Sequence, residues 1–131
     1  MTGGEVPRQE AEATGLRVFV CDDAPEHRAL VRAVLADLPG VEVVGEAFDG
    51  ATCLTGLALT SPDLVVLDLQ MPGTDGWYVI DALRKWPAAP RVLVVSSDAR
   101  AGERVRAAGA SFLPKGSPFQ ALRAAVLEAA R

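Results

Sequence analysis

Cysteine and histidine are scarce in this chain, which has two cysteines and one histidine among 131 residues. Cys21 lies in a predicted strand and Cys53 in a predicted helix, and neither belongs to a CxxC pair or stands near a histidine cluster. A disulfide framework or a zinc site needs such groupings, so the sequence favours neither. We expect both cysteines to be small residues in or near the core.

Long apolar runs and an excess of basic residues are also lacking. No run approaches the roughly 20 residues of a membrane-spanning helix, and the N-terminus lacks the basic-then-apolar order of a signal peptide. We therefore expect a cytoplasmic protein without a membrane partner. The formal net charge is −4, and because phosphate binding needs clustered Lys and Arg, direct nucleic-acid binding by this segment is not expected.

The composition suits one domain with a proper core, because 50% of the residues are hydrophobic and the length is typical of a single domain. Residues 1–14 carry glycine, proline and mixed charge without an apolar period. Such a segment is expected to be a flexible, solvated tail. The ordered domain should span residues 15–131.

Short apolar runs alternate with helical patterns from residue 16 onward. β-Branched and apolar runs predict strands, and a 3.6-residue apolar period predicts helices. The predicted strands cover 16–21, 41–47, 64–67, 92–95 and 111–115, and the predicted helices begin near residues 25, 51, 77, 99 and 117. This alternation predicts an α/β fold, a flavodoxin-like (βα)5 doubly wound parallel sheet with strand order 2-1-3-4-5.

Two segments near the C-terminus have weaker patterns. The helix predicted over 99–108 has Val105 as its only large apolar residue and contains Gly102, which costs a helix about 1 kcal/mol relative to alanine. We expect it to be the least firmly anchored helix. The strand that follows contains Pro114, and because proline cannot donate to a ladder, this strand belongs at the edge of the sheet.

A single carboxylate, Asp68, follows the apolar run 64–67 and precedes a Pro/Gly turn in the sequence LVVLDLQMPGTDG. Open α/β sheets bind ligands at the carboxyl ends of their strands, so Asp68 is a candidate nucleophile or metal ligand. The alternative is that Asp68 only begins a turn. Asp22 and Asp23 end the first predicted strand, and the predicted strand order brings them close to Asp68.

Three such carboxylates need a counter-charge. At about 5 Å apart they repel one another by roughly 3 kcal/mol per pair at an effective dielectric constant near 20. Hard oxygen ligands favour Mg²⁺, with Mn²⁺ or Ca²⁺ as substitutes. Asp23 has a second interpretation, because it could cap the first helix with Glu26 completing a capping box.

Two further polar residues end strands at the same edge of the predicted sheet. Ser96 follows the fourth strand and Lys115 follows the fifth. A lysine is usually a surface residue, but next to three acids Lys115 would supply an ammonium group. Metal-binding acids, an acceptor, a hydroxyl and an ammonium group together suit phosphoryl transfer, in which positioning and charge neutralisation do most of the catalysis.

These motifs resemble those of the response-regulator receiver domain of two-component signalling. The matching segments, in the family's order, are the DD of VFVCDD, the D of VVLDLQMPGTDG, the S of VLVVSSDA and the K of FLPKGSP. The resemblance covers the chain from about Leu16 onward. It implies that Asp68 accepts a phosphoryl group from a sensor histidine kinase. It also implies that Asp23, Asp68 and the Gln70 backbone carbonyl bind Mg²⁺ directly, while Asp22 holds it through water.

The resemblance implies roles for the residues around the acceptor as well. Lys115 would pair with the phosphoryl oxygens, and Ser96 would donate a hydrogen bond to one of them. Phe112 would be the aromatic residue whose packing changes when Ser96 moves. Gln70 and Asp98 would flank the path of the hydrolytic water and so tune dephosphorylation.

The signal is expected to leave through the helix at 99–108, the strand at 111–115 and the final helix, which could also form a homodimer. Phrases such as VEVVGEAFDG and LPKGSP are similar to the subfamily that joins a receiver to a LuxR-type helix-turn-helix domain, which implies transcription regulation. A free-standing receiver that relays phosphoryl groups, or binds a partner without DNA output, fits the sequence equally well. No enzyme activity is expected beyond its own phosphoryl transfer and autodephosphorylation.

The sequence departs from the family pattern at two positions. Gly116 follows Lys115 where many receivers carry proline, so the usual cis peptide bond is not expected. Phe112 replaces a common tyrosine, so this residue has no phenolic hydroxyl.

Three other classes fit less well. A haloacid-dehalogenase-type phosphatase would need a DxD arrangement, whereas Asp22 and Asp23 are adjacent. A flavin-binding module would need a Ser/Thr/Gly-rich loop where this chain has CDDAPEH. A receiver-like domain that is not phosphorylated typically loses an acid or the lysine, and this chain retains them all.

Overall fold

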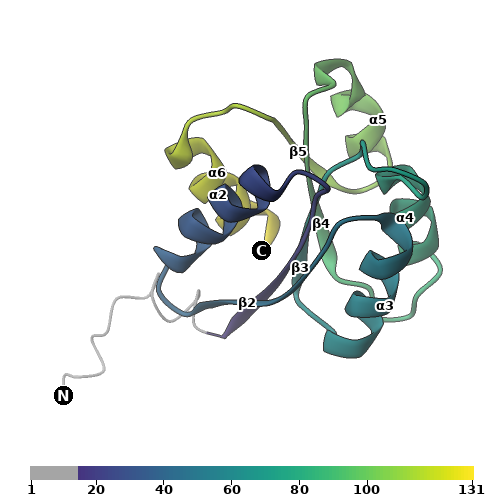
Figure 1. Cartoon of the computed structure of the whole chain (residues 1–131), viewed down its shortest axis with the longest axis horizontal. Helices are drawn as coiled ribbons and strands as arrows, with labels where there is room; N and C mark the ends of the chain where they lie inside the picture. The colour runs from purple at the N-terminus through teal and green to yellow at the C-terminus, as the bar shows by residue number, and fades with distance from the viewer. Residues whose placement is uncertain (1–14) are drawn as a thin grey trace.

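The computed structural model describes residues 15–131, so the tail predicted over 1–14 lies outside the described residues. Five parallel strands form one sheet in the order β2-β1-β3-β4-β5, which confirms the predicted topology (Figure 1). The strands are β1 (Leu16–Cys21), β2 (Val41–Ala47), β3 (Leu64–Leu67), β4 (Arg91–Ser96) and β5 (Ser111–Pro114). The strand with Pro114 lies at the edge, as predicted, because β5 pairs with β4 alone.

Helices cover both faces of the sheet. They are α2 (Pro25–Ala36), α3 (Gly50–Thr60), α4 (Gly76–Leu83), α5 (Gly102–Ala107) and α6 (Phe119–Ala129), with a 3₁₀ turn, η2 (Ala99–Ala101), before α5. Helices α2 and α6 pack on one face, and α3, α4 and α5 pack on the other (Figure 1). Among the described residues, no helix is long and apolar enough to span a membrane.

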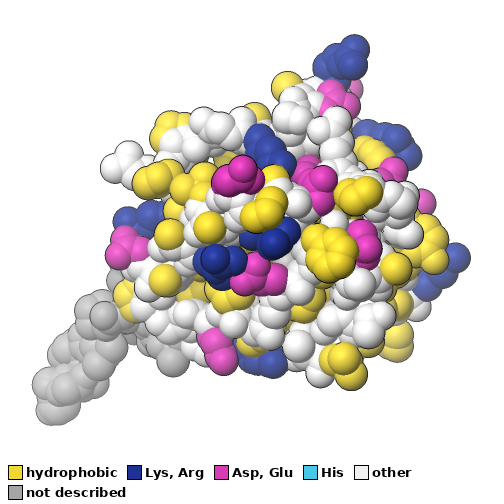
Figure 2. Space-filling view, viewed as in Figure 1, with side chains coloured by type: hydrophobic (Ala, Val, Ile, Leu, Met, Phe, Trp, Pro, Cys, Tyr) yellow, Lys and Arg dark blue, Asp and Glu magenta, His cyan; other side chains and the backbone are white. Residues whose placement is uncertain are grey.

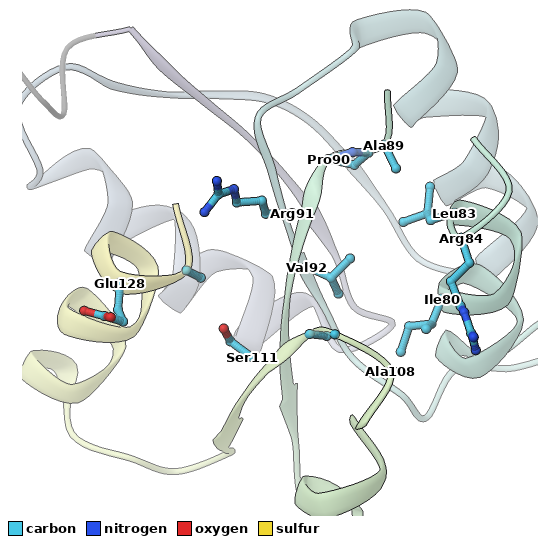
Figure 3. A pocket seen from close by; sticks show the side chains of 13 residues that line it. Ile80, Leu83, Arg84, Ala89, Pro90, Arg91, Val92, Ala108, Ser111 and Glu128 are labelled. Carbon is cyan, nitrogen blue, oxygen red and sulfur yellow. The ribbon is translucent and has the colours of Figure 1, made fainter. Parts of the chain in front are cut away.

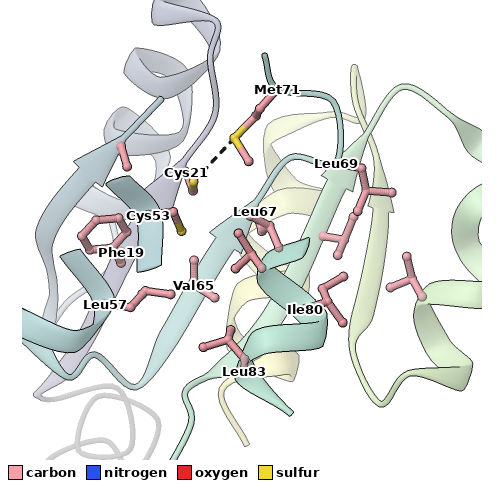
Figure 4. Packing of buried hydrophobic residues seen from close by; sticks show 14 of the residues in the cluster. Phe19, Cys21, Cys53, Leu57, Val65, Leu67, Leu69, Met71, Ile80 and Leu83 are labelled. Carbon is pink, nitrogen blue, oxygen red and sulfur yellow. Dashed lines mark hydrogen bonds between the residues drawn. The ribbon is translucent and has the colours of Figure 1, made fainter. Parts of the chain in front are cut away.

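The alternation of side chains along β1 fills both cores. Val18 and Val20 belong to the cluster under α2 and α6, whereas Phe19 and Cys21 belong to the cluster under α3, α4 and α5 (Figure 4). Strand β3 is buried at all four positions. This continuous burial is typical of a central strand in a parallel sheet covered on both faces.

Both cysteines are buried free thiols, which confirms their predicted place in the core. The Cys21 Sγ atom lies 3.6 Å from the Met71 Sδ atom (Figure 4). The neighbouring Cys53 thiol, together with burial, raises the pKa of Cys21. The Cys21 thiol therefore stays protonated at neutral pH.

Two predicted helix starts differ from the structure by one or two residues. The helix predicted from residue 77 begins at Gly76, because the Asp75 carboxylate accepts a hydrogen bond from the Tyr78 amide and so caps α4. The final helix begins at Phe119, since Pro118 has extended backbone angles. The capping role considered for Asp23 was also wrong, because Ala24 is the N-cap residue of α2 and no side chain caps that end.

The helix predicted over 99–108 divides into η2 and the six-residue α5. Asp98 caps η2 by accepting a hydrogen bond from the Arg100 amide. In α5, Val105 is fully buried, Gly102 lies next to Phe112, and the Arg104 guanidinium lies 3.8 Å from the centre of a Trp77 ring on α4. The weak anchoring expected of this segment stays a prediction.

Candidate functional site

The three acids meet where β1 and β3 end. Cys21 pairs with Leu67, and the Asp68 amide donates to the Cys21 carbonyl over 2.9 Å. Carboxylate oxygens of Asp22, Asp23 and Asp68 lie within 4.8 Å of one another. Asp22 and Asp68 are buried, whereas Asp23 is exposed. The structure thus brings together the three acids that strand order had placed at one edge.

Lys115 reaches the same acids from the end of β5. Its Nζ atom lies 3.0 Å from Asp68 Oδ2 and 3.3 Å from Asp22 Oδ2. Its backbone amide donates to the Ser96 carbonyl over 2.9 Å, which ties the ends of β4 and β5 together. The Ser96 side chain is fully buried, and its Oγ atom accepts a hydrogen bond from the Asp98 amide.

His27 is a site residue that sequence reasoning missed. His27 is the single histidine of the chain, and its Nδ1 atom lies 2.6 Å from Asp22 Oδ2. The next residue, Arg28, donates through Nη1 to the Asp22 backbone carbonyl over 2.7 Å. The sequence does contain a signal for this contact. A helix that begins at Pro25, shortly after β1 ends at Cys21, brings the side chains of its first turn close to the end of β1.

The two buried acids have pKa shifts in opposite directions. Burial by itself raises the pKa of Asp22, but hydrogen bonds from His27 and the Ala24 amide and the charge of Lys115 lower it below its ordinary value. Burial raises the pKa of Asp68, even though Lys115 and the Gln70 amide donate hydrogen bonds to it. Burial lowers the pKa of Lys115, but contacts with the two acids outweigh it and the net shift is upward.

Gln70 and Asp98 lie at the rim of the acid cluster. With Asp23, they line a hollow of about 630 Å³. The Gln70 side-chain carbonyl accepts a hydrogen bond from the Ser97 hydroxyl over 3.0 Å, so this amide is held at the opening. Phe112 is half-buried on β5, where it packs against the core cluster under α3, α4 and α5 and lies next to Gly102 of α5.

The donor set of the cluster fits a hard divalent cation. The three carboxylates lie together and one ammonium group, that of Lys115, contacts two of them, which leaves two negative charges to be compensated. Oxygen donors of this kind are those that Mg²⁺ prefers. Asp22 Oδ1 accepts from the Ala24 amide, and Asp22 Oδ2 contacts His27 and Lys115. Asp22 is therefore suited to an indirect contact through water.

A second hollow, of about 440 Å³, lies at the opposite edge of the sheet (Figure 3). It is lined by the starts of β4 and β5 and by the ends of α4 and α6, including Leu83, Val92, Ser111 and Glu128.

In the described part of the chain, the three acids are the only cluster of three or more potential metal-binding side chains. The chemistry therefore concentrates at the carboxyl edge.

Comparison with known proteins gives consistent matches to one family. A family model described as "Response regulator receiver domain" matches residues 18–127. The chain is 38% identical over 119 residues to the "Probable transcriptional regulatory protein NarL" of Mycobacterium tuberculosis, covering 88% of this chain and 55% of that protein. It is 48% identical over 93 residues to "Protein-glutamate methylesterase/protein-glutamine glutaminase 5" of Myxococcus xanthus, covering 71% of this chain and 27% of that protein. The chain thus spans about a quarter to a half of the length of these relatives.

A solved structure agrees with the sequence matches. The signal receiver domain of the putative response regulator NarL from Mycobacterium tuberculosis superposes with a TM-score of 0.82 and 38% sequence identity, covering 89% of this chain and 97% of that chain.

Proposed function

Since this chain belongs to the response regulator receiver domain family, we propose that it is a phosphorylation-controlled switch in which Asp68 accepts a phosphoryl group from a sensor histidine kinase. One observation carries this proposal: Lys115 Nζ lies 3.0 Å from a buried carboxylate oxygen of Asp68 at the carboxyl edge of the sheet. A buried acceptor that already contacts the Lys115 ammonium group suits an anionic group, because this cation can pair with the added negative charge.

The chain's own residues perform the transfer. A carboxylate oxygen of Asp68 attacks the phosphorus atom, and the bond between phosphorus and the donor's leaving atom breaks as the new bond forms. Lys115 pairs with the phosphoryl oxygens. The Ser96 hydroxyl, which accepts from the Asp98 amide, donates its own proton to one of them. Burial of Asp68 limits access by water during this step.

Asp23, Asp68 and the Gln70 backbone carbonyl would hold Mg²⁺ directly, and Asp22 would hold it through water. When bound, the ion would neutralise the acids and offset the charge of the transferring phosphoryl group. The proposal extends to the lifetime of the modified state. Gln70 and Asp98 line the hollow beside the acids, so their side chains are proposed to tune the approach of the hydrolytic water.

We expect incubation with acetyl phosphate and Mg²⁺ to add one phosphoryl group to the protein, measured as a mass gain of the intact chain. The same incubation with excess EDTA should add none, because Lys115 alone leaves two acid charges uncompensated and these repel the incoming anion. Restoring Mg²⁺ in excess of EDTA should restore the mass gain. An equal mass gain with and without free Mg²⁺ would contradict the proposed metal dependence.

The proposed output surface consists of α5, β5 and α6. Phosphorylation adds roughly −1.5 to −2 charge and three acceptor oxygens. Ser96 moving toward these oxygens would vacate buried space behind it, and Phe112 could turn into that space. Because Phe112 packs against Gly102, α5 would adjust, and a homodimer partner or an attached output domain would meet a changed surface.

Hydrogen exchange should detect this adjustment. With beryllofluoride and Mg²⁺ bound, we expect protection in residues 96–115 to change by at least about fivefold, the lower end of typical coupling between sites. The matched reference is α2, whose buried face contacts the other side of the sheet and should change less. Equal protection of residues 96–115 in both states, with beryllofluoride bound, would exclude this face as the switch.

The proposed output is transcription regulation through an attached DNA-binding domain. The match to the NarL protein supports it, because that match covers 88% of this chain, against 71% for the methylesterase match. The second candidate is a free-standing receiver that relays phosphoryl groups or binds a partner protein.

A further inference from the structure

Asp22 is held by more protein donors than a carboxylate that serves only as a metal ligand needs. The Ala24 amide donates to Oδ1 over 2.8 Å. His27 Nδ1 lies 2.6 Å from Oδ2, and Lys115 Nζ lies 3.3 Å from the same oxygen. Arg28 Nη1 donates to the Asp22 backbone carbonyl over 2.7 Å. These contacts leave Asp22 little freedom to rotate.

The contact with His27 is directional. An ionised carboxylate can only accept hydrogen bonds, so the His27 Nδ1 atom carries the proton and donates it. The His27 side chain is 15% exposed and the Asp22 side chain 4%, so water competes little for this bond. Since α2 begins at Pro25, a rigid element supplies the donor.

We propose that His27 is a positioning residue, which orients the Asp22 carboxylate for the divalent cation of the acid cluster through the hydrogen bond from Nδ1 to Oδ2. This inference rests on the proposed function, because it assigns His27 a task in the metal site which that function requires. His27 does not touch the cation or the phosphoryl group. It acts through Asp22, as residues behind metal-binding carboxylates commonly do.

One further contact, from Arg28, fixes the backbone of the same residue. Arg28, which donates to the Asp22 carbonyl, also donates through Nε to Glu46 Oε1 on β2 over 3.2 Å. Arg32, one turn further along α2, donates to both Glu46 oxygens. Basic side chains accordingly lie beside an acidic one over α2 and β2 (Figure 2). Arg32 shares the Glu46 contact without touching Asp22, so it offers a matched control.

The test measures Mg²⁺ affinity by titration calorimetry, without a phosphodonor. In His27→Leu, which retains bulk but lacks the donor, we expect the Kd for Mg²⁺ to rise about tenfold, the lower end of effects from residues behind metal ligands. His27→Asn carries an N–H at the place of Nδ1 and should restore the Kd to within about threefold of wild type. Arg32→Leu should leave the Kd unchanged.

Phosphoryl transfer supplies a second readout. At saturating Mg²⁺, His27→Leu should be labelled by acetyl phosphate at the wild-type maximal rate, with only the Mg²⁺ concentration for half-maximal rate increased. A merely structural role would lower the maximal rate too, and His27→Asn would not rescue it. An unchanged or lower Kd for Mg²⁺ in His27→Leu would overturn the inference.

The two proposals fail in distinguishable ways. If wild-type protein is labelled but the Kd does not respond to His27→Leu, the positioning role is wrong and the proposed function stands. If the Kd rises in His27→Leu but wild-type protein accepts no phosphoryl group, the positioning role stands and the proposed function is wrong.

Discussion

Replacing Asp68 with asparagine is expected to abolish phosphoryl incorporation, lowering the labelling rate by at least about 10³-fold, because loss of a nucleophile typically removes most of the rate enhancement. Asparagine keeps the size of the side chain and can still accept a hydrogen bond from Lys115, but it has no anionic oxygen to attack phosphorus. The measurement is the mass gain of intact protein with acetyl phosphate and Mg²⁺. Asp81→Asn, which changes an exposed acid of α4, should be labelled like wild type.

Loss of labelling in Asp68→Asn should not come from unfolding. Burial raises the pKa of Asp68, so the ionised carboxylate is less favourable in the folded state than in the unfolded chain at neutral pH. In the absence of Mg²⁺, the free energy of unfolding of Asp68→Asn should therefore be equal to that of wild type or about 1 kcal/mol higher. This gain should shrink as the pH falls through the raised pKa, because the wild-type carboxyl then becomes neutral.

Labelling of Asp68→Asn at the wild-type rate would assign the acceptor to another residue.

Replacing Gly76 with alanine is expected to destabilise the fold by about 3 kcal/mol, the upper end of typical overpacking effects. The Gly76 amide donates to the Leu69 carbonyl over 2.9 Å, so α4 begins directly against the loop that carries Asp68. A Cβ atom on Gly76 would lie 2.7 Å from Leu69 Cα and would also contact the Asp68 carbonyl oxygen. Both neighbours are backbone atoms, so relief requires moving α4 or the acceptor loop.

Urea unfolding of Gly76→Ala and Gly102→Ala would check this explanation. Gly102 also begins a helix, but a Cβ atom there would meet the flexible end of Arg106 at 3.1 Å and Phe112 at 3.3 Å. Because alanine favours helix by about 1 kcal/mol over glycine, Gly102→Ala should change the free energy of unfolding by no more than about 1 kcal/mol. Equal losses in the two variants would show that the close approach of α4 is not the cause.

Several properties of this protein follow from local patterns in the sequence. The apolar run at 64–67 predicted β3, and the β-branched and aromatic run at 16–21 predicted β1. The alternation of strand and helix patterns along the chain predicted the α/β fold. In a parallel sheet all strands end at the same edge, so chain position alone placed Asp68 and Lys115 there. The buried place of Cys21 and the edge position of Pro114 followed from the same reasoning.

The boundaries and the partners of the site residues required the tertiary structure. The start of α4 at Gly76 depends on the Asp75 cap, and the division of the segment at 99–107 depends on Asp98 capping η2. No sequence period shows that His27 reaches Asp22, because that contact depends on how α2 is rotated against the end of β1. Strand order is encoded in patterns that each segment carries by itself, whereas a hydrogen bond between side chains on different elements is decided only when packing sets their relative rotation and distance.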